Sequence, residues 1–343
     1  MIKAAVVGYG YSGRCFHTYL APMADGLELG AIVSGSPAHQ EAIRADHPEA
    51  RLYPTVKEML ADSSIGLVIL ATPHDTHKDL AIQAMNAGKN VVTDKIMALS
   101  AAEAEEMIAA RDRNGVMLSV FHNRRWDWDY LTVKQAIADD LLGTPYLFET
   151  AIMGYSQPGG WRGQRSKVGS ILFDWGAHFV DQALQLVDAP VASVFCDAQH
   201  HHAASDIESY ARLRMRFAND VIYVVELGNR ALAGKPRWYV LGDKGALVKN
   251  GLDPQEGPMR ERRIEAAAED PANRARVTTL RSGEREELVL ETVQGTWKSY
   301  YQNIADVLNH GTELAVKPEE ALKCMRIFDA AMRSAESGQV VRL

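Results

Sequence analysis

The chain has 343 residues, of which 47% are hydrophobic and 24% charged, a composition typical of globular proteins. This length predicts two domains, each able to bury its own core. The net charge of −7, from 37 basic and 44 acidic residues with no block of like charge, argues against a nucleic acid or an anionic membrane as partner. We therefore expect a small-molecule partner.

The cysteines and the N-terminus indicate a protein of the reducing cytoplasm. Cys15, Cys196 and Cys324 are far apart and form no CxxC pair, so neither a disulfide nor a structural zinc is expected. The N-terminal "MIKAAVVGYG" enters a glycine turn at once and predicts a strand rather than a signal peptide. No apolar run approaches the roughly 20 residues that a membrane helix needs.

Residues 1–121 alternate between strand and helix patterns. Two of the helical stretches begin with capping boxes, Thr55 with Glu58 and Ser100 with Glu103. This alternation predicts an α/β domain whose parallel sheet is covered on both faces and binds ligands at the carboxyl ends of its strands. The apolar runs that predict its strands are "IKAAVV", "LELGAIVS", "GLVILAT", "NVVTD" and "VMLSVF".

A glycine motif directly follows the first of these strands. Gly8, Gly10 and Gly13 have the G-x-G-x-x-G spacing and open a helix, with Tyr9, Tyr11 and Ser12 between them. At such a turn the backbone can approach a pyrophosphate, whose charge meets the free N–H groups of the helix start. These residues predict a dinucleotide site, whereas a plain tight turn is the alternative.

The end of the second predicted strand favours NADP over NAD. An NAD site usually has an acid there that holds the ribose, but "VSGSPAHQ" has none before Glu41. Ser34 and Ser36 can donate hydroxyls, Ser36 with the following proline predicts a helix start that attracts anions, and His39 can help when protonated. NAD stays the alternative cofactor, and simple helix capping the alternative role.

Two later strand ends also face the expected cofactor. Thr72, Pro73 and His74 follow the run "GLVILAT" and are predicted beside the ribose or nicotinamide, while His77 is expected on a helix surface. The next strand ends in Asp94 and Lys95. Burying an ammonium at a strand mouth costs several kcal/mol unless it is used. Lys95 is therefore a candidate for stabilising an alkoxide, with Asp94 fixing a ribose or the lysine, and a lysine at the rim is the alternative.

After Phe121 the pattern predicts a second, α+β domain. Its strand candidates include "YLFETAIMGY", "VASVFCDA", "SYARLRMRFA", "VIYVVELGNR" and "RWYVLGDKGALVKN". Short turns between them suggest an antiparallel sheet. Residues 251–285 are charged and are expected to form a mobile excursion, and helices are expected near 296–310 and 318–337.

The stretch "FDWGAHFVD" supplies candidate acid–base groups. Asp174, His178 and Asp181 share one face if residues 173–181 are helical. That face is either a solvated one or a general base with its partner, and Asp181 is equally suited to a structural contact. A metal is not expected: His200, His201 and His202 are adjacent and fan apart. The aromatic stretch "NRRWDWDY" indicates cleft lining.

Together these segments resemble the glucose–fructose oxidoreductase and inositol dehydrogenase family, Gfo/Idh/MocA, over nearly the whole chain. The resemblance rests on "GYGYSG", "ATPHDTH", "TDKIMA", "FHNRRWDWDYLT", "GGWRG", "GSILFDWGAHFVDQ" and "SYYQNIADVLNHG". It is strongest to the branch of NADP-dependent scyllo-inositol dehydrogenases and related sugar oxidoreductases. In two places the chain departs from the family pattern: Ile96 follows the lysine where the family has proline, which leaves the local geometry open, and Ser170 replaces a glycine.

The resemblance implies a Rossmann domain at residues 1–121 and an α+β substrate and oligomerisation domain at 122–343. The second domain would carry a large open, mainly antiparallel sheet that joins copies into a homo-dimer or homo-tetramer. Lys95, Asp174 and His178 would be the catalytic set for hydride transfer between nicotinamide C4 and a hydroxyl-bearing carbon of a sugar or cyclitol. Further residues are implied at the cofactor, namely Asn123, Trp161 and Arg162, and at the substrate, namely Arg124, Tyr155 and Tyr301.

Two other functions remain open at this stage. One is a glycosidase that keeps a nicotinamide cofactor bound and uses it transiently. The other is a non-catalytic NADP-responsive binding protein, against which the joint presence of lysine, histidine and aspartate argues.

Overall fold

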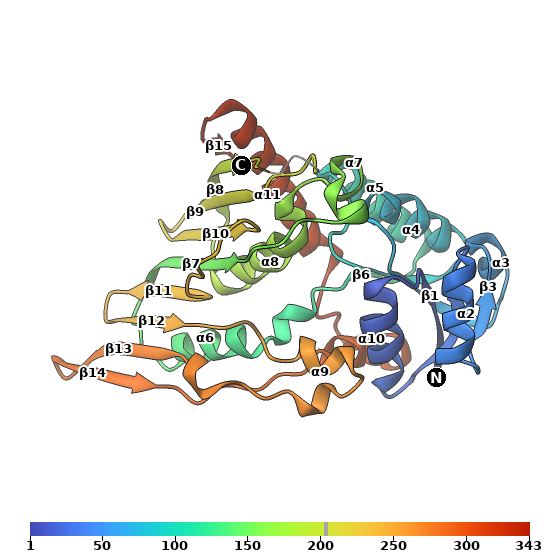
Figure 1. The fold of residues 1–343 in the computed structure, drawn as a ribbon, viewed down its shortest axis with the longest axis horizontal. Coiled ribbons are helices and arrows are strands. Elements are labelled where there is room, and N and C mark those ends of the chain that lie inside the picture. Colours follow the sequence, from blue (N-terminus) through green and yellow to red (C-terminus); the bar gives the residue numbers. More distant parts are fainter. Residues whose placement is uncertain (202–204) are drawn as a thin grey trace. The chain divides into compact units, whose positions relative to one another are not determined.

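A computed structural model describes residues 1–201 and 205–343, so His202 of the histidine run lies outside the described residues. The described chain divides into two compact units (Figure 1). Unit 1 comprises residues 1–123, 256–266 and 296–325, and unit 2 comprises 124–255, 267–295 and 326–343. None of the described helices is long and apolar enough to cross a bilayer.

Unit 1 contains a six-stranded parallel sheet of order β3-β2-β1-β4-β5-β6, the order of a dinucleotide-binding fold. Its central strands are continuous apolar runs because both faces are covered; Ala4 and Leu67, for example, are completely buried. The predicted parallel sheet is thus confirmed. The strands are β1 (Ile2–Val7), β2 (Leu27–Val33), β3 (Arg51–Tyr53), β4 (Ile65–Leu70), β5 (Asn90–Thr93) and β6 (Leu118–Val120).

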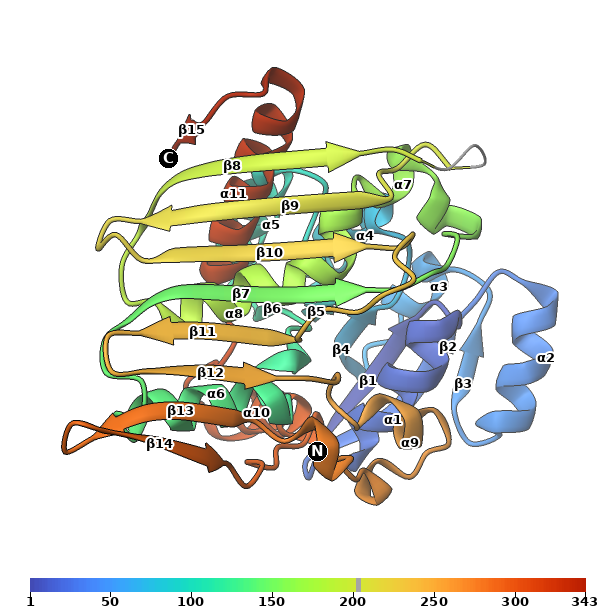
Figure 2. The same cartoon turned by 60° about the vertical axis from the view of Figure 1, so that its left-hand side comes forward.

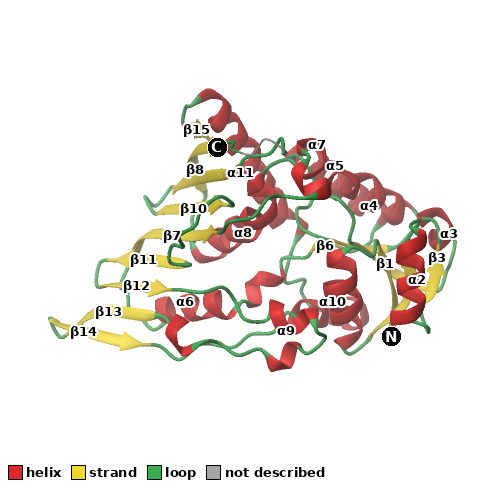
Figure 3. Cartoon of the chain, in the orientation of Figure 1, coloured by secondary structure: helices red, strands yellow, loops and turns green. Residues whose placement is uncertain are grey.

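Helices and turns connect these strands (Figure 3). The predicted caps are confirmed, since the backbone N–H groups of Glu58 and Glu103 donate to the hydroxyls of Thr55 and Ser100. Within the sheet of unit 1, β3 is the strand that sequence patterns missed, because three residues are too few to show a period. The connecting elements are the π-helical η1 (Gly13–His17), α1 (Thr18–Leu20), η2 (Ala21–Met23), α2 (Pro37–Asp46), α3 (Val56–Leu60), η3 (His74–Thr76), α4 (His77–Asn86) and α5 (Ala101–Asn114).

Two late segments of the chain complete unit 1, although the predicted division at residue 121 places them in the second domain. They contain α9 (Glu256–Arg260) with η7 (Ile264–Ala266), and α10 (Lys298–His310). Aromatic packing explains why α10 belongs here: Phe16 stacks on Trp297 at 5.6 Å, and Phe121 meets Tyr300 edge-on at 4.9 Å.

Unit 2 is built on a nine-stranded sheet of order β14-β13-β12-β11-β7-β10-β9-β8-β15. Its neighbouring strands are antiparallel except β7 and β10, which run parallel. Figure 2 shows the strands edge to edge with α6 and α8 behind them. The predicted open, mainly antiparallel sheet is therefore confirmed. The strands are β7 (Pro145–Met153), β8 (Val191–Gln199), β9 (Tyr210–Phe217), β10 (Ile222–Gly228), β11 (Trp238–Gly242), β12 (Gly245–Lys249), β13 (Arg276–Arg281), β14 (Glu284–Val289) and β15 (Val341–Arg342).

The remaining elements of unit 2 are helical. The predicted late helices are confirmed, the second of them being α11 (Pro318–Ser337), which contributes to both units. The others are η4 (Asn123–Trp126), which begins at the last residue of unit 1's first segment, α6 (Trp128–Ala138), η5 (Gly160–Gly163), α7 (Arg165–Val168), the π-helical η6 (Leu172–Gly176), α8 (Ala177–Leu186) and η8 (Pro271–Asn273).

Two details of the predicted second domain were wrong. The single strand expected over 237–250 is a hairpin of β11 and β12, because the chain reverses at Asp243 and Lys244. The stretch 251–285, expected to be a mobile excursion, contains α9 and β13, and β13 pairs with both β12 and β14. Some of its apolar residues, such as Val277 and Met259, are buried, but they are spaced too sparsely among charged residues to show in the sequence.

Candidate active site

The glycine turn after β1 fits a dinucleotide. Gly8 has a φ of +99°, and a Cβ there would lie 2.5 Å from the Ala71 carbonyl oxygen. A Cβ on Gly13 would lie 2.1 Å from the Gly8 oxygen, so both positions require glycine. Among the described residues nothing lies within 4 Å of a Cβ built on Gly10, which leaves its backbone open to a ligand. These are the three roles of the glycines in a nucleotide-binding turn.

The side chains within the turn point to different places. Tyr9 is buried against Ile32 and Ile43, and its hydroxyl donates to Asp46 at 2.7 Å. Tyr11 is 44% exposed and bonds Glu256. Of the predicted cofactor side chains in this turn, Tyr9 therefore lies in the core of unit 1, and any role it has toward a ligand is through its backbone.

The end of β2 carries hydroxyls rather than an acid. Ser36 is the N-cap of α2 and accepts a hydrogen bond from the backbone of His39, while the Ser34 hydroxyl accepts one from the Ser36 backbone at 3.3 Å. The first turn of α2 has no acidic residue. This helix start therefore offers positive partial charge and hydroxyls to an anionic group.

The segment after β4 differs from its prediction in one residue. Thr72 and Pro73 follow the strand, and His74 is buried at the start of η3. His77, expected on the surface, is completely buried; its ring nitrogens lie 2.7 Å from the Ile96 carbonyl oxygen and 3.0 Å from that of Thr72. It therefore ties the end of β4 to the segment that follows Lys95.

Asp94 and Lys95 lie at the carboxyl end of β5. The Asp94 carboxylate accepts hydrogen bonds from the Lys95 backbone N–H at 2.7 Å and from the Ser12 hydroxyl. Burial alone would raise the pKa of Asp94, but His17, Lys95 and Ser12 outweigh it and hold that pKa well below its ordinary value. Lys95 is half-buried, and the peptide bond from Lys95 to Ile96 is cis.

Unit 2 presents Asp174 and His178 from the start of one helix, but not with the geometry of a simple α-helix. The π-helical η6 contains Asp174 and continues into α8, which contains His178. Asp174 is 31% exposed, whereas His178 is 6% exposed with its ring 6.3 Å from that of Trp175. Asp181 is buried in an ion pair with Arg125, which assigns it the structural role.

Arg124 is held over Trp175 by a buried polar network. Its guanidinium carbon lies 4.4 Å from the Trp175 ring centroid, and its Nη1 pairs with the Asp127 carboxylate at 3.1 Å. Its backbone oxygen accepts from the Gln182 side chain at 2.8 Å. These contacts fix the tryptophan face beside His178.

Asp127, Asp129 and Asp253 form a buried cluster of carboxylates within 4.8 Å of one another. Asp129 pairs with Arg237 at 2.9 Å, and Asp253 accepts the backbone N–H that starts α6 at 2.7 Å. Burial and the charge of Asp129 raise the pKa of Asp253 to about 6. Protein contacts of this kind explain the cluster without a metal ion.

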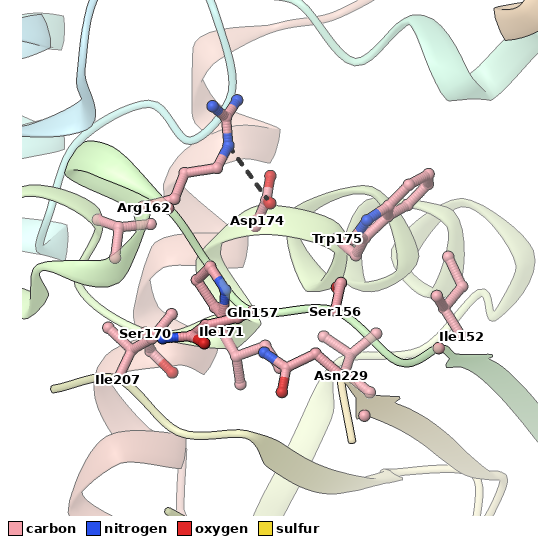
Figure 4. A pocket seen from close by; sticks show the side chains of 16 residues that line it. Ile152, Ser156, Gln157, Arg162, Ser170, Ile171, Asp174, Trp175, Ile207 and Asn229 are labelled. Carbon is pink, nitrogen blue, oxygen red and sulfur yellow. Dashed lines mark ion pairs between the residues drawn. The ribbon is translucent and has the colours of Figure 1, made fainter. Parts of the chain in front are cut away.

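Beside Asp174 lies a cavity of about 330 Å³, formed entirely within unit 2. Figure 4 shows Arg162 reaching over it toward Asp174, with the two charged groups 3.7 Å apart, and Trp175 on its border. Ser156, Gln157 and Asn229 add hydrogen-bonding groups. An aromatic wall, a carboxylate and several amides and hydroxyls suit a neutral polyhydroxylated ring. The lining also includes Ile152, Pro158, Val168, Ser170, Ile171, Ile207 and Leu227.

The other predicted site residues have varied surroundings. Trp161 stacks with the Arg162 guanidinium at 4.5 Å, and Tyr155 is 60% exposed under Arg230. Asn123 is 2% exposed, and its side-chain nitrogen has no hydrogen-bond partner among the described residues. Tyr301 differs most from its prediction: it is completely buried and its hydroxyl bonds His17, so a direct substrate contact is not available to it in this structure.

Sequence reasoning missed Gln157 and Asn229 as pocket residues and missed the contact of His17 with Asp94. The first two lie on loops whose residues have no periodic pattern. The signal for His17 is its position in the helix that follows the glycine motif, but the partner that gives it meaning, Asp94, is 77 positions away.

Residues 2–122 match the model of the oxidoreductase family with an NAD-binding Rossmann fold, and residues 130–248 match the Gfo/Idh/MocA C-terminal domain. A similar curated protein is the scyllo-inositol 2-dehydrogenase (NADP(+)) IolW of Bacillus subtilis, 30% identical over 348 residues, which cover 100% of this chain and 96% of IolW. The D-apiose dehydrogenase of Paraburkholderia graminis is 26% identical, and the alignment covers 99% of this chain and 89% of that protein.

Solved structures show the same arrangement of the fold. The yvaA protein of Bacillus subtilis has a TM-score of 0.93 and 30% identity, with 100% of this chain and 98% of that chain covered. An oxidoreductase from Klebsiella pneumoniae has a TM-score of 0.88 and 32% identity, and the match covers 100% of this chain and 95% of that chain.

Proposed function

Because the chain belongs to the Gfo/Idh/MocA family of NAD(P)-dependent oxidoreductases that act on sugars, we propose that it transfers a hydride between NADP and a secondary alcohol or ketone of a neutral sugar or cyclitol. The single observation that carries the substrate class is the cavity beside Asp174, with its tryptophan wall and neutral hydrogen-bonding groups.

The choice of NADP rests on the end of β2. Ser34 and Ser36 offer hydroxyls, and the start of α2 carries the positive end of the helix dipole with no acid in its first turn, which suits a phosphate on the ribose. The NADP in the name of the Bacillus subtilis relative agrees with this choice. When bound, the nicotinamide supplies the carbon that accepts or donates the hydride.

In the proposed reaction the protein's own residues move the proton and stabilise charge. His178 takes the hydroxyl proton as the alcohol is oxidised, since an imidazole titrates near neutrality. Lys95 stabilises the negative charge that develops on the same oxygen. Asp174 binds a neighbouring hydroxyl and orients the ring in the cavity.

The fold also supports an assembly through the sheet of unit 2. Glu149 of β7 and Arg212 of β9 are 42% and 47% exposed and lie 3.7 Å apart, so one face of the sheet carries accessible charged groups. We propose that this face joins two or four copies. The three free thiols, Cys15, Cys196 and Cys324, suit a cytoplasmic location.

The test is a spectrophotometric screen of inositols, aldoses, sugar acids and keto-sugars with NADP and NAD in parallel. We expect turnover with a neutral polyol and NADP, and its loss by at least about 10²-fold in Lys95→Ala and His178→Ala. Lys57→Ala and His310→Ala, at exposed positions, serve as matched controls. Unchanged turnover in Lys95→Ala and His178→Ala would refute the mechanism, and release of a free sugar without net change in NADPH would favour the glycosidase instead.

A further inference from the structure

His17 connects two elements of unit 1 that the proposed mechanism does not link. It lies in η1, is completely buried, and packs its ring against Phe121 at 4.6 Å. Its Nδ1 is 2.6 Å from the hydroxyl of Tyr301 in α10. Its Nε2 lies 3.4 Å from the carboxylate of Asp94 at the end of β5. A buried histidine with Nδ1 bonded to a phenol and Nε2 at ion-pair distance from a carboxylate is an oriented group, because the two ring nitrogens face different polar groups.

The Asp94 carboxylate, which His17 contacts, also has hydrogen-bond donors of its own. Asp94 accepts from the Ser12 hydroxyl and from the Lys95 backbone, and its side chain is only 14% exposed. An ionised carboxylate in such a place requires stabilising partners, because desolvation favours the neutral form. His17 is the partner that Tyr301 fixes in place, and the positive charge of the neighbouring Lys95 also favours the ionised carboxylate.

We propose that His17 is a positioning residue of the reaction: clamped by Tyr301, it keeps the Asp94 carboxylate oriented and ionised, and Asp94 in turn holds the Lys95 ammonium that stabilises the substrate oxygen. This inference rests on the proposed function of Lys95. It gives Tyr301 a role through His17 in place of contact with substrate.

Several titratable groups share this region and set the electrostatics. Three of these groups interact electrostatically with Asp94: Lys95 at the end of β5, His17 in η1 and Tyr301 in α10. The charge of Asp94 is also felt by His77 in α4, whose pKa burial lowers. Burial likewise raises the pKa of Tyr301 well above its ordinary value, so its hydroxyl keeps its proton as a partner for His17.

The first test compares the pH dependence of kcat in His17→Leu, His17→Gln and the wild type. Leucine removes the imidazole that lies 3.4 Å from the Asp94 carboxylate, so we expect the acidic limb of the profile to move upward by about one pH unit. Glutamine keeps an amide donor near the Nε2 position, so we expect it to restore most of the wild-type profile. Tyr301→Phe should give a smaller shift of the same sign. Tyr300→Phe, whose hydroxyl bonds Ser119 at 2.9 Å, is the matched control.

The second test needs no turnover. Acetylation of Lys95 by an amine-reactive ester is followed residue by residue with mass spectrometry at neutral pH. We expect about tenfold faster labelling of Lys95 in Asp94→Asn and an increase in His17→Leu, since the ammonium loses its opposite charge, while Lys57 labels at an unchanged rate. Circular dichroism confirms that each variant is folded.

The outcomes separate this inference from the proposed function. An active wild type with a dead Lys95→Ala, together with wild-type pH profiles and Lys95 labelling in His17→Leu, would overturn the role of His17 alone. A wild type without turnover on any polyol would overturn the proposed function, and the labelling rates would then still decide whether His17 supports Asp94 and Lys95.

Discussion

The carboxylate of Asp181 accepts two hydrogen bonds from the Arg125 guanidinium, of 2.6 and 2.8 Å, with both side chains at most 10% exposed. Removing one partner of a buried ion pair leaves the other charge uncompensated. We therefore expect Asp181→Asn to lower the free energy of unfolding by about 3 kcal/mol, measured by urea denaturation.

The same substitution at Asp174 is the control for this pair. Asp174 lies 3.7 Å from Arg162, and both side chains are about one-third exposed, so Asp174→Asn should change stability by less than about 1 kcal/mol while abolishing turnover. Equal losses of stability in the two variants would contradict the structural role of Asp181.

In the glycine turn, alanine should weaken cofactor binding at one position and lower stability at another. Gly10→Ala places a methyl group in open space, so the thermal midpoint should stay near that of the wild type while NADPH affinity, from fluorescence titration, falls at least about tenfold. Gly13→Ala forces a clash with the Gly8 backbone and should lower the midpoint. Tight NADPH binding by Gly10→Ala would show that the ligand does not approach there.

Cofactor preference should follow the residue at the end of β2. A carboxylate at position 34 repels a ribose phosphate and accepts hydrogen bonds from a free ribose. We expect Ser34→Asp to raise the KM for NADP by at least about tenfold and to lower that for NAD. Ser64→Asp, at an exposed position remote in sequence, is the control. An unchanged ratio of the two KM values would place the specificity elsewhere.

The buried Asp253 makes stability depend on pH. Its pKa is raised from 3.8 to about 6, so between these values the folded state binds more protons than the unfolded state. The free energy of unfolding therefore falls as pH rises through this range and is level above it. The free energy of unfolding of Asp253→Asn minus that of the wild type should therefore increase by about 1 kcal/mol from pH 5 to pH 7. Urea unfolding at each pH measures this difference. A pH-independent difference between the two proteins would contradict the raised pKa.

Local sequence patterns were sufficient for most of the fold. The parallel sheet of unit 1 follows from continuous apolar runs, and its caps from Thr55 and Ser100, because each signal lies within a few residues. The glycine motif is local in part: the φ of Gly8 and the approach of Gly13 to the Gly8 oxygen are properties of one turn, whereas the approach of Gly8 to Ala71 comes from the neighbouring strand. The strand β13 within residues 251–285 could not be predicted in this way, since it is stabilised by pairing with strands on both sides rather than by its own pattern.

The chemistry-bearing residues divide in the same manner. Sequence alone marked Lys95, Asp174 and His178 as candidates through their residue types and spacing, and it left Asp181 undecided. Tertiary structure decided that Asp181 pairs with Arg125, that Tyr301 is buried, and that His17 meets Asp94. Such contacts join residues tens to hundreds of positions apart, and the desolvation and partners that set a side chain's role exist only once the chain has brought them together.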